Sequence, residues 1–292
     1  PSRRGYSLRE GIRAAEWRLW GACSYKWAYL PSHIMAVIPC PMGHTCRPRR
    51  AHFATIHRLE DSIVPYNISF ISLGCAKNLV NTEQMMALVR SAGHEITAQP
   101  EGADAAVLNT CGFIDSAKSE AIQNILELAE LKKEGKLGKL LVTGCLSQRY
   151  QDELMEELPE VDGVMGTGSY TEIVPALEEL MAGGTPHRFG DIDHTEEDGA
   201  RIPATPSYTA YLKIAEGCDH RCAFCIIPKL RGRYRSRTME SLLAEAKTLA
   251  DAGVKELIVI AQDITRYGID LYHKRMLGAL LTELCKLPFH WI

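Results

Sequence analysis

Three cysteines with the spacing of metal ligands lie in the stretch from Glu216 to Arg237. Cys218, Cys222 and Cys225 are separated by three and then two residues. Thiols this close on one short loop converge on a point, and three of them cannot all pair as disulfides. A structural zinc site takes four protein ligands, whereas three cysteines can hold a cubane iron–sulfur cluster and leave one iron open. The spacing therefore indicates a cluster, with zinc as the alternative if His220 supplies a fourth ligand.

A second set of three cysteines is spread along the first half of the chain. Cys75, Cys111 and Cys145 each follow a short apolar segment by one or two residues, beside Gly or Asn-Thr. A single cysteine in such a place is most simply a small buried apolar side chain. Three in equivalent places, next to residues that suit turns, predict a second cluster assembled from separate loops.

The order of the predicted elements explains how these loops would meet. Strands that alternate with helices at this spacing predict a parallel, doubly wound α/β sheet. The carboxyl ends of its strands share one edge, where ligands bind. The predicted strands are 68–73, 95–99, 105–109, 139–143 and 163–165, and the predicted helices are 78–92, 116–133, 150–158 and 170–181. The apolar faces of the first two helices include Leu79, Met86, Leu88, Val89, Ile122 and Leu126.

The pattern restarts at Tyr208, where a predicted strand leads into the 218–225 loop. Strands alternating with helices after it predict the start of a (β/α) barrel, with chemistry at the carboxyl ends of its strands. About two and a half strand–helix units are too few to close a barrel, so we expect the chain to be a fragment truncated at the C-terminus. Cys285 falls on the apolar side of the last helix and is predicted to be a core residue. The predicted strands are 208–214, 256–260 and 289–292, and the predicted helices are 238–252 and 276–287.

These patterns divide the chain into four segments. Residues 1–66 are expected to be a poorly ordered extension, because they lack sustained periodicity. Residues 67–183 form the predicted first α/β domain, with the auxiliary site, and 208–292 an incomplete second domain. Between them, 184–207 is a predicted linker, rich in Gly, Pro, Thr and acidic residues.

Composition narrows the classes of function. The chain has 292 residues, 46% of them hydrophobic, which is enough for two domains with cores. Its net charge of −3 does not suggest binding to DNA, and no apolar run reaches the roughly 18 residues of a membrane span. Residues 1–66 carry a net +6, which leaves −9 for the rest. Ten cysteines, most of them at strand ends or in the 218–225 loop, fit a reducing cytoplasm and metal ligation.

The 218–225 loop, directly after the first strand of a (β/α) domain, resembles the radical SAM superfamily. By that resemblance, the open iron would bind S-adenosyl-L-methionine (SAM), and the reduced cluster would split it to form a radical. Phe224 matches the aromatic residue that packs by the adenine, and Gln262 lies where the superfamily contacts the amino group of SAM. A basic run follows the loop and is either a solvated surface or a binding site for the SAM carboxylate or an acidic substrate. It consists of Lys229, Arg231, Arg233, Arg235 and Arg237.

The two cysteine sets together resemble the radical SAM methylthiotransferases, from about Ile68 to the end. Four stretches resemble the branch that modifies a ribosomal protein: Ser72–Glu83, Asn109–Glu120, Lys213–Pro228 and Ala261–Asp270. Two features depart from the family. Its longer barrel and small C-terminal β-domain are missing, and it has nothing like residues 1–66.

The resemblance implies a transferase that adds a methylthio group to the β-carbon of an aspartate of small-subunit ribosomal protein twelve. It implies two 4Fe-4S clusters, SAM, an electron donor such as flavodoxin or ferredoxin, and no separate acid or base. The alternatives are a tRNA adenosine methylthiotransferase and a non-catalytic zinc- or cluster-binding module. The implied metal ligands are Cys75, Cys111, Cys145, Cys218, Cys222 and Cys225.

Overall fold

A computed structural model describes residues 65–193 and 199–292, all within one compact unit. The predicted extension 1–66 lies outside the described residues, except for Pro65 and Tyr66. In the two described ranges, no helix has the length and apolar character needed to cross a membrane.

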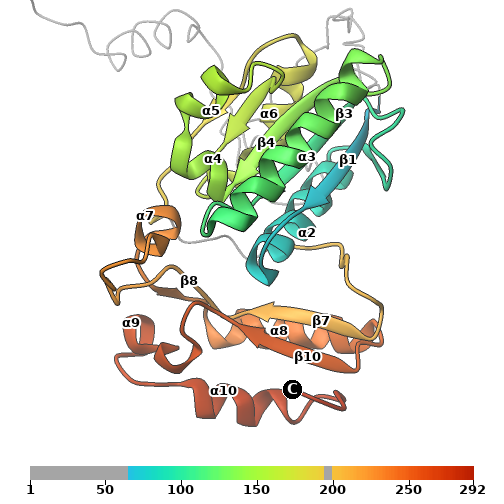
Figure 1. The fold of residues 1–292 in the computed structure, drawn as a ribbon. Coiled ribbons are helices and arrows are strands. Elements are labelled where there is room, and N and C mark those ends of the chain that lie inside the picture. The colour runs from blue at the N-terminus through green and yellow to red at the C-terminus, as the bar shows by residue number, and fades with distance from the viewer. Residues whose placement is uncertain (1–64, 194–198) are drawn as a thin grey trace, which may run out of the picture. The chain divides into compact units, whose positions relative to one another are not determined.

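A six-stranded, all-parallel sheet organises the first half of the described chain (Figure 1). Its strand order is β2-β1-β3-β4-β5-β6, so β1, β3 and β4 are direct neighbours. All six residues of β3 are buried, as expected for a central strand covered on both faces. The strands are β1 (Asn67–Ser72), β2 (Glu95–Thr97), β3 (Ala105–Thr110), β4 (Lys139–Gly144), β5 (Gly163–Met165) and β6 (His187–Arg188).

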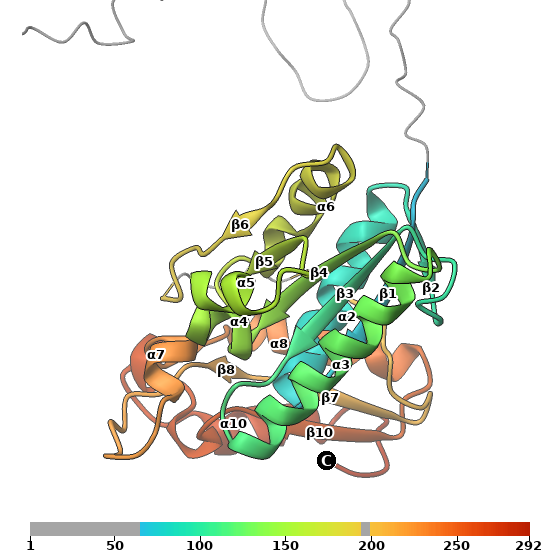
Figure 2. The ribbon, with the colours of Figure 1, turned by 45° about the horizontal axis from the view of Figure 1, so that its top comes forward.

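Helices cover both faces of this sheet, so the doubly wound α/β class is confirmed (Figure 2). On one face, Ile125 of α3 (Asp115–Lys133) packs with the strands, together with residues of α4 (Cys145–Tyr150) and α5 (Asp152–Glu157). The opposite face is covered by α2 (Ala76–Ser91) and α6 (Ile173–Met181), the latter preceded by the 3-10 turn η1 (Tyr170–Glu172).

Several local expectations about this half are wrong. The helix predicted at 150–158 corresponds to α5, but the separate short helix α4 before it was not predicted. The two helices are divided at Gln151, which adopts a positive φ of 42°. The expected linker 184–207 contributes β6 to the sheet. Ile122 and Leu126 are 41% and 42% exposed, so the buried stripe of α3 is narrower than predicted.

The second half forms a βαβ unit in which β7 (Thr209–Lys213) pairs in parallel with β10 (Glu256–Ile260). The connecting helix α8 (Met239–Asp251) and the later helix α10 (Leu277–Leu284) pack against this pair around a common core. Thr238 caps α8 by accepting a hydrogen bond from the Ser241 N–H. The shorter elements are β8 (Ala215–Glu216), α7 (Ile227–Arg231), β9 (Arg235–Ser236), η2 (Ile264–Arg266) and α9 (Ile269–Tyr272).

Two expectations near the end of the chain are also wrong. The strand predicted at 289–292 is reduced to one parallel bridge between Trp291 and Glu256. Cys285 caps the C-terminus of α10 and is exposed, because α10 buries only Leu280 and Leu284 on its inner face. Cys285 is therefore a surface thiol and not a core residue.

Candidate metal centre

The first cysteine set gathers at the carboxyl edge of three neighbouring strands. Cys75 follows β1 and precedes the first residue of α2, Cys111 follows β3, and Cys145 follows β4 as the first residue of α4. Since β1, β3 and β4 are adjacent, the topology brings the three thiols to one place. Cys145 is 4% exposed, Cys111 is half-buried and Cys75 is exposed, so the set runs from the core to the surface.

The loops that carry these thiols pack closely enough to require glycine. A Cβ on Gly74 would lie 2.6 Å from the Cβ and 3.3 Å from the Sγ of Cys111. A Cβ on Gly112 would lie 2.8 Å from the carbonyl oxygen of Cys145. Gly144, with φ of 97°, leaves no room for a side chain against Thr110. The donor set and its glycine cradle fit a cluster held by three cysteines.

Asn78, in the first turn of α2, hydrogen-bonds to the loop that follows β1 and to the end of β3. Its buried side-chain amide donates to the carbonyl oxygens of Leu73 at 3.1 Å and Thr110 at 2.9 Å. Its Oδ1 lies 3.9 Å from the Sγ of Cys145. Asn78 was not predicted from the sequence, because an asparagine near a helix start usually serves a local cap.

The surroundings of the thiols differ in their effect on thiolate formation. Although Cys75 lies at the surface, partial desolvation of its thiol raises its pKa. The charges of Arg231 and Lys77 and two backbone N–H groups outweigh this, so the net pKa is lowered. Burial also raises the pKa of Cys145, and there the opposing charge of Arg231 does not outweigh it. Metal ligation requires thiolates, so the charge of Arg231, which acts on both Cys75 and Cys145, favours the form that ligates.

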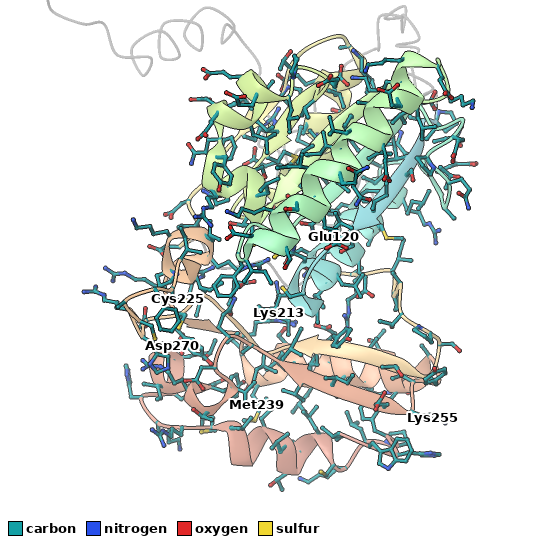
Figure 3. All side chains as sticks on the ribbon, in the orientation of Figure 1. Glu120, Lys213, Cys225, Met239, Lys255 and Asp270 are labelled. Carbon is teal, nitrogen blue, oxygen red and sulfur yellow. The ribbon has the colours of Figure 1, made fainter. Side chains whose placement is uncertain are left out.

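The second cysteine set sits on a loop closed by the β8–β9 ladder. The Cys218 N–H donates to the Gly232 carbonyl at 3.0 Å, and the Cys225 N–H donates to the Cys222 carbonyl at 3.0 Å. Cys222 is exposed and the other two thiols are half-buried. Asp270, labelled with Cys225 in Figure 3, anchors β9 by accepting from the N–H and hydroxyl of Ser236 at 2.7 and 2.6 Å.

Three other predicted residues surround this loop. The imidazole of His220 is 2.7 Å from Asp263, so its ring already has a partner other than a metal. Phe224 is 92% exposed and packs against no core. Gln262 follows β10 and donates to Glu216 at 2.8 Å, while its own side-chain oxygen is buried with no hydrogen-bond partner. The SAM contacts expected of Phe224 and Gln262 stay predictions.

In neither cysteine set are the side chains as close to one another as the ligands of a single metal ion would be. Within residues 65–193 and 199–292, no group of three His, Cys, Asp or Glu side chains is close enough to hold a single metal ion. A four-iron cluster occupies the middle of its ligand set, so its cysteines stand further apart than those around one ion.

A buried charged network joins the basic run to the first half. Arg231 on α7 donates to Glu216 at 2.8 Å and, in a short hydrogen bond, to the Oδ1 of Asn78. Lys213 contacts Glu216 at 3.2 Å and Asn81 of α2 at 3.3 Å (Figure 3). Burial raises the pKa of Glu216, but the two cations and the Gln262 amide outweigh it and hold that pKa well below its usual range. The basic run is therefore not uniformly a solvated surface.

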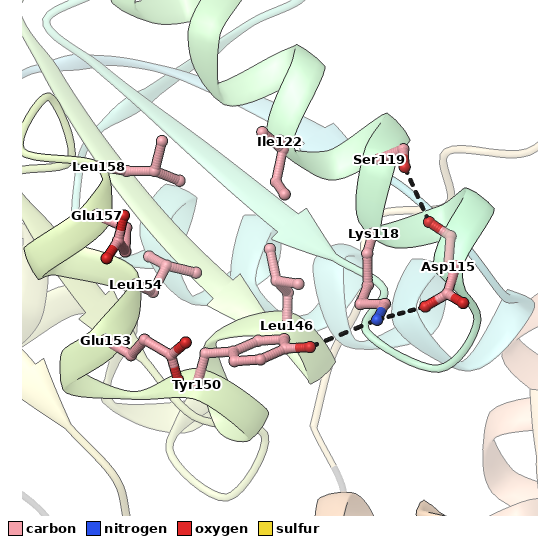
Figure 4. Close-up of a pocket in the computed structure, with 10 residues that line it drawn as sticks. All are labelled: Asp115, Lys118, Ser119, Ile122, Leu146, Tyr150, Glu153, Leu154, Glu157 and Leu158. Carbon is pink, nitrogen blue, oxygen red and sulfur yellow. Dashed lines mark hydrogen bonds and ion pairs between the residues drawn. The ribbon is translucent and has the colours of Figure 1, made fainter.

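A pocket of about 340 Å³ opens on the first half between α3, α4 and α5 (Figure 4). Its floor is apolar, with Leu146 and Leu154, and its rim carries Glu153, Glu157 and an Asp115–Lys118 ion pair at 2.5 Å. It contains no residue of either cysteine set, so the sequence analysis had not singled it out.

Comparison with known proteins identifies the family of the chain. The model of uncharacterized protein family UPF0004 matches residues 67–166, and that of the radical SAM superfamily matches residues 212–286. The ribosomal protein uS12 methylthiotransferase RimO of Clostridioides difficile is 53% identical over 227 residues, and the protein of that name from Symbiobacterium thermophilum is 51% identical over 230. The chain belongs to the radical SAM methylthiotransferase family.

The alignments cover only part of these methylthiotransferases. They include 77% and 78% of this chain but 51% and 47% of the two relatives, so the chain spans about half the length of the relatives it matches. The fold also resembles a solved radical SAM methyltransferase, TsrM of Kitasatospora setae. The TM-score is 0.52 at 12% identity, over 75% of this chain and 50% of that one.

Proposed function

We propose that this methylthiotransferase adds a methylthio group to the β-carbon of an aspartate of small-subunit ribosomal protein uS12. The observation that carries the proposal is the presence of two three-cysteine sets in one compact unit. Relatives about 50% identical, named as uS12 methylthiotransferases, support the choice of substrate.

We assign Cys218, Cys222 and Cys225 to a SAM-binding 4Fe-4S cluster, and the set of Cys75, Cys111 and Cys145 to an auxiliary one. When bound, these groups supply the radical that removes hydrogen from an unactivated C–H bond and the sulfur that replaces it. The β1–β6 sheet and the separate β7–β10 pair support two domains, at 67–183 and 208–292. Strand β6, in the segment 184–207 between them, extends the first sheet beyond residue 183.

The chain's own residues hold and shape these sites. Gly217, with φ of 75°, turns the backbone from β8 into the 218–225 loop, and Asp263 pairs with His220 of that loop. Exposure of Cys222 and Phe224 leaves the loop open to a cofactor. Gln262 places an unpaired amide oxygen beside it, an acceptor suited to the SAM amino group.

The proposed chemistry also sets requirements outside the chain. Reductive cleavage of SAM needs an electron donor such as flavodoxin or ferredoxin. Thiolate-ligated clusters persist in a reducing compartment, so we place the protein in the cytoplasm.

Anaerobic reconstitution with iron and sulfide counts tests the cluster assignment. We expect about eight irons for the whole chain, as two four-iron clusters, and about four after Cys218→Ala, Cys222→Ala and Cys225→Ala together. A Cys285→Ala variant, which removes a surface thiol outside both sets, should retain the full count. Bound zinc without sulfide would instead support the non-catalytic module.

Mass analysis of a deletion strain tests the substrate. The methylthio group should disappear from ribosomal protein uS12 and remain on tRNA adenosine. Its loss from tRNA alone would replace the proposal by the tRNA-modifying alternative.

A further inference from the structure

The pocket between α3, α4 and α5 combines an apolar floor with an acidic rim (Figure 4). Leu146 and Leu154 of the floor are buried, whereas Ile122 of α3 forms part of the wall and is 41% exposed. With a volume of about 340 Å³, the pocket can accept a large apolar side chain. An apolar hollow with a polar rim is typical of a surface that another protein covers.

The charges on the rim favour a positively charged partner. Lys118, the cation among the lining residues, is paired with Asp115 at 2.5 Å and lies 3.5 Å from the Tyr150 hydroxyl. Glu153 and Glu157 are exposed and one turn apart on α5, and neither forms an ion pair within the described ranges. Three carboxylates and one cation therefore line the pocket, which gives it a net charge of 1 − 3 = −2.

The pocket adjoins the first cysteine set through the chain itself. Helix α4 begins with Cys145, and its next residue, Leu146, belongs to the floor. Tyr150, at the end of α4, is about 8 Å further along that helix. On the rim, Asp115 is the first residue of α3 and comes shortly after Cys111. A partner that fills the pocket therefore lies beside the auxiliary site.

The stretch between Cys111 and the pocket also exposes apolar surface. Phe113 and Ile114, just before α3, are 42% and 53% exposed. Arg149 of α4 donates to the Gly112 carbonyl at 2.9 Å and so fixes the start of this stretch against α4. Arg149 does not line the pocket, and counting it with the rim still leaves a net charge of −2 + 1 = −1.

We propose that this pocket docks a basic segment of ribosomal protein uS12. A large apolar side chain of the segment fills the pocket, and Lys or Arg side chains next to it pair with Glu153 and Glu157. The inference rests on the proposed function, which supplies the substrate. A protein that binds ribosomal RNA carries Lys and Arg against the phosphates, so the charge of the rim suits it.

The same geometry relates the docked segment to the reaction. An extended chain spans about 3.3 Å per residue. An aspartate on the order of three to five residues from the apolar anchor would therefore reach the auxiliary site, where the proposed function places the sulfur.

Binding of purified uS12 to the whole chain tests the proposal. Fluorescently labelled uS12 is titrated with the chain, and anisotropy gives the dissociation constant at several salt concentrations. The rim variant carries Glu153→Gln and Glu157→Gln together. Its control carries Glu101→Gln and Glu178→Gln, which remove the same net charge at two exposed carboxylates outside the pocket.

The apolar part of the site is tested with Ile122→Ser. Leu126→Ser is the matched control, because Leu126 is one turn later on α3, is 42% exposed and does not line the pocket. Circular dichroism of each variant verifies that it folds.

We expect the rim variant to bind uS12 roughly threefold to tenfold more weakly than the wild type, because two charge contacts are lost. Its dissociation constant should also depend less on salt, since salt screens those contacts. Ile122→Ser should weaken binding about fivefold and leave the salt dependence unchanged. Both controls should bind as the wild type does.

Equal dissociation constants within either matched pair would overturn the inference, and so would a wild-type chain that does not bind uS12. If Ile122→Ser does not fold, the rim pair decides alone, because its changes are at exposed side chains. Mass analysis of the deletion strain does not depend on the pocket. A methylthio group that remains on uS12 there overturns the proposed function, and with it the choice of uS12 as the occupant.

Discussion

Arg201 is the clearest case of one side chain holding distant parts of the chain together. Its guanidinium is 2.8 Å from Glu83 on α2 and 2.9 Å from Glu245 on α8, and it also donates to the Tyr211 carbonyl. The Arg201 and Glu83 side chains are 5% and 2% exposed. Without Arg201, Glu83 would keep only its hydrogen bond from the Ala204 N–H.

We expect Arg201→Met to lower the free energy of unfolding by about 3–5 kcal/mol, because it leaves a buried carboxylate without its counter-charge. Urea unfolding of the variant measures the loss. Arg90→Met, at an exposed position on α2, is the control and should change stability by less than about 0.5 kcal/mol. Similar values for both variants would show that the buried pair contributes nothing.

Tyr267 is fully buried, and its hydroxyl donates to the Arg237 carbonyl at 3.0 Å. Burial, with nearby Tyr272 and Glu240, raises its pKa well above the usual value near 10. The unfolded chain therefore releases this proton at a lower pH than the folded one. The stabilisation is complete below about pH 10 and is lost as the pH rises towards the folded pKa.

We accordingly expect the free energy of unfolding to fall more steeply above pH 10 in the wild type than in Tyr267→Phe, which has no proton to lose. Urea unfolding between pH 8 and 11 measures the two slopes. Tyr208→Phe, at a ring that is 60% exposed, serves as the control. Parallel slopes for wild type and Tyr267→Phe would contradict the expectation.

Among the elements, the loop that begins at Gly217 depends most on the absence of a side chain. The φ of Gly217 is 75°, and a Cβ there would lie 1.9 Å from the Arg233 carbonyl oxygen. Gly253 has a similar φ of 94°, yet a Cβ there would meet nothing within 4 Å. An alanine would be strained by the positive φ at either position, but only at Gly217 would its Cβ also collide with a neighbouring atom.

Gly253→Ala should therefore cost about 1–2 kcal/mol of stability from the positive φ alone. Gly217→Ala should cost about 3–5 kcal/mol, because overpacking against the β9 side of the loop adds to the strain. Thermal and urea unfolding of the two variants give the difference. Equal losses would mean that the loop moves away from Arg233 at no cost.

The polar residues of α2 connect the two halves of the described chain. Asn78, Asn81 and Glu83 are buried and contact Arg231, Lys213 and Arg201 respectively. The sequence analysis instead placed the buried side of this helix at Leu79, Met86, Leu88 and Val89, of which only Val89 is buried. A buried polar face cannot be distinguished from a solvated one by periodicity, because both lack apolar residues.

At the scale of the whole molecule, these contacts predict cooperative unfolding. If one half unfolded alone, the other would lose the ion pairs and hydrogen bonds that join the two halves. We expect calorimetry of the chain to show one main transition. Two well-separated transitions would show that the halves are independent.

The six cysteines, their grouping and the alternation of strands and helices that places them at strand ends could all be predicted from the amino-acid sequence. Those features are local, because spacing and periodicity depend only on residues that are close together in the sequence. In contrast, the contact between Asn78 and Arg231 beside Cys145, and the ion pair of Arg201 with Glu83, became apparent only in the folded chain. Such partners stand more than 100 residues apart, and the helix and strand periods of the chain carry no information on which polar faces will meet.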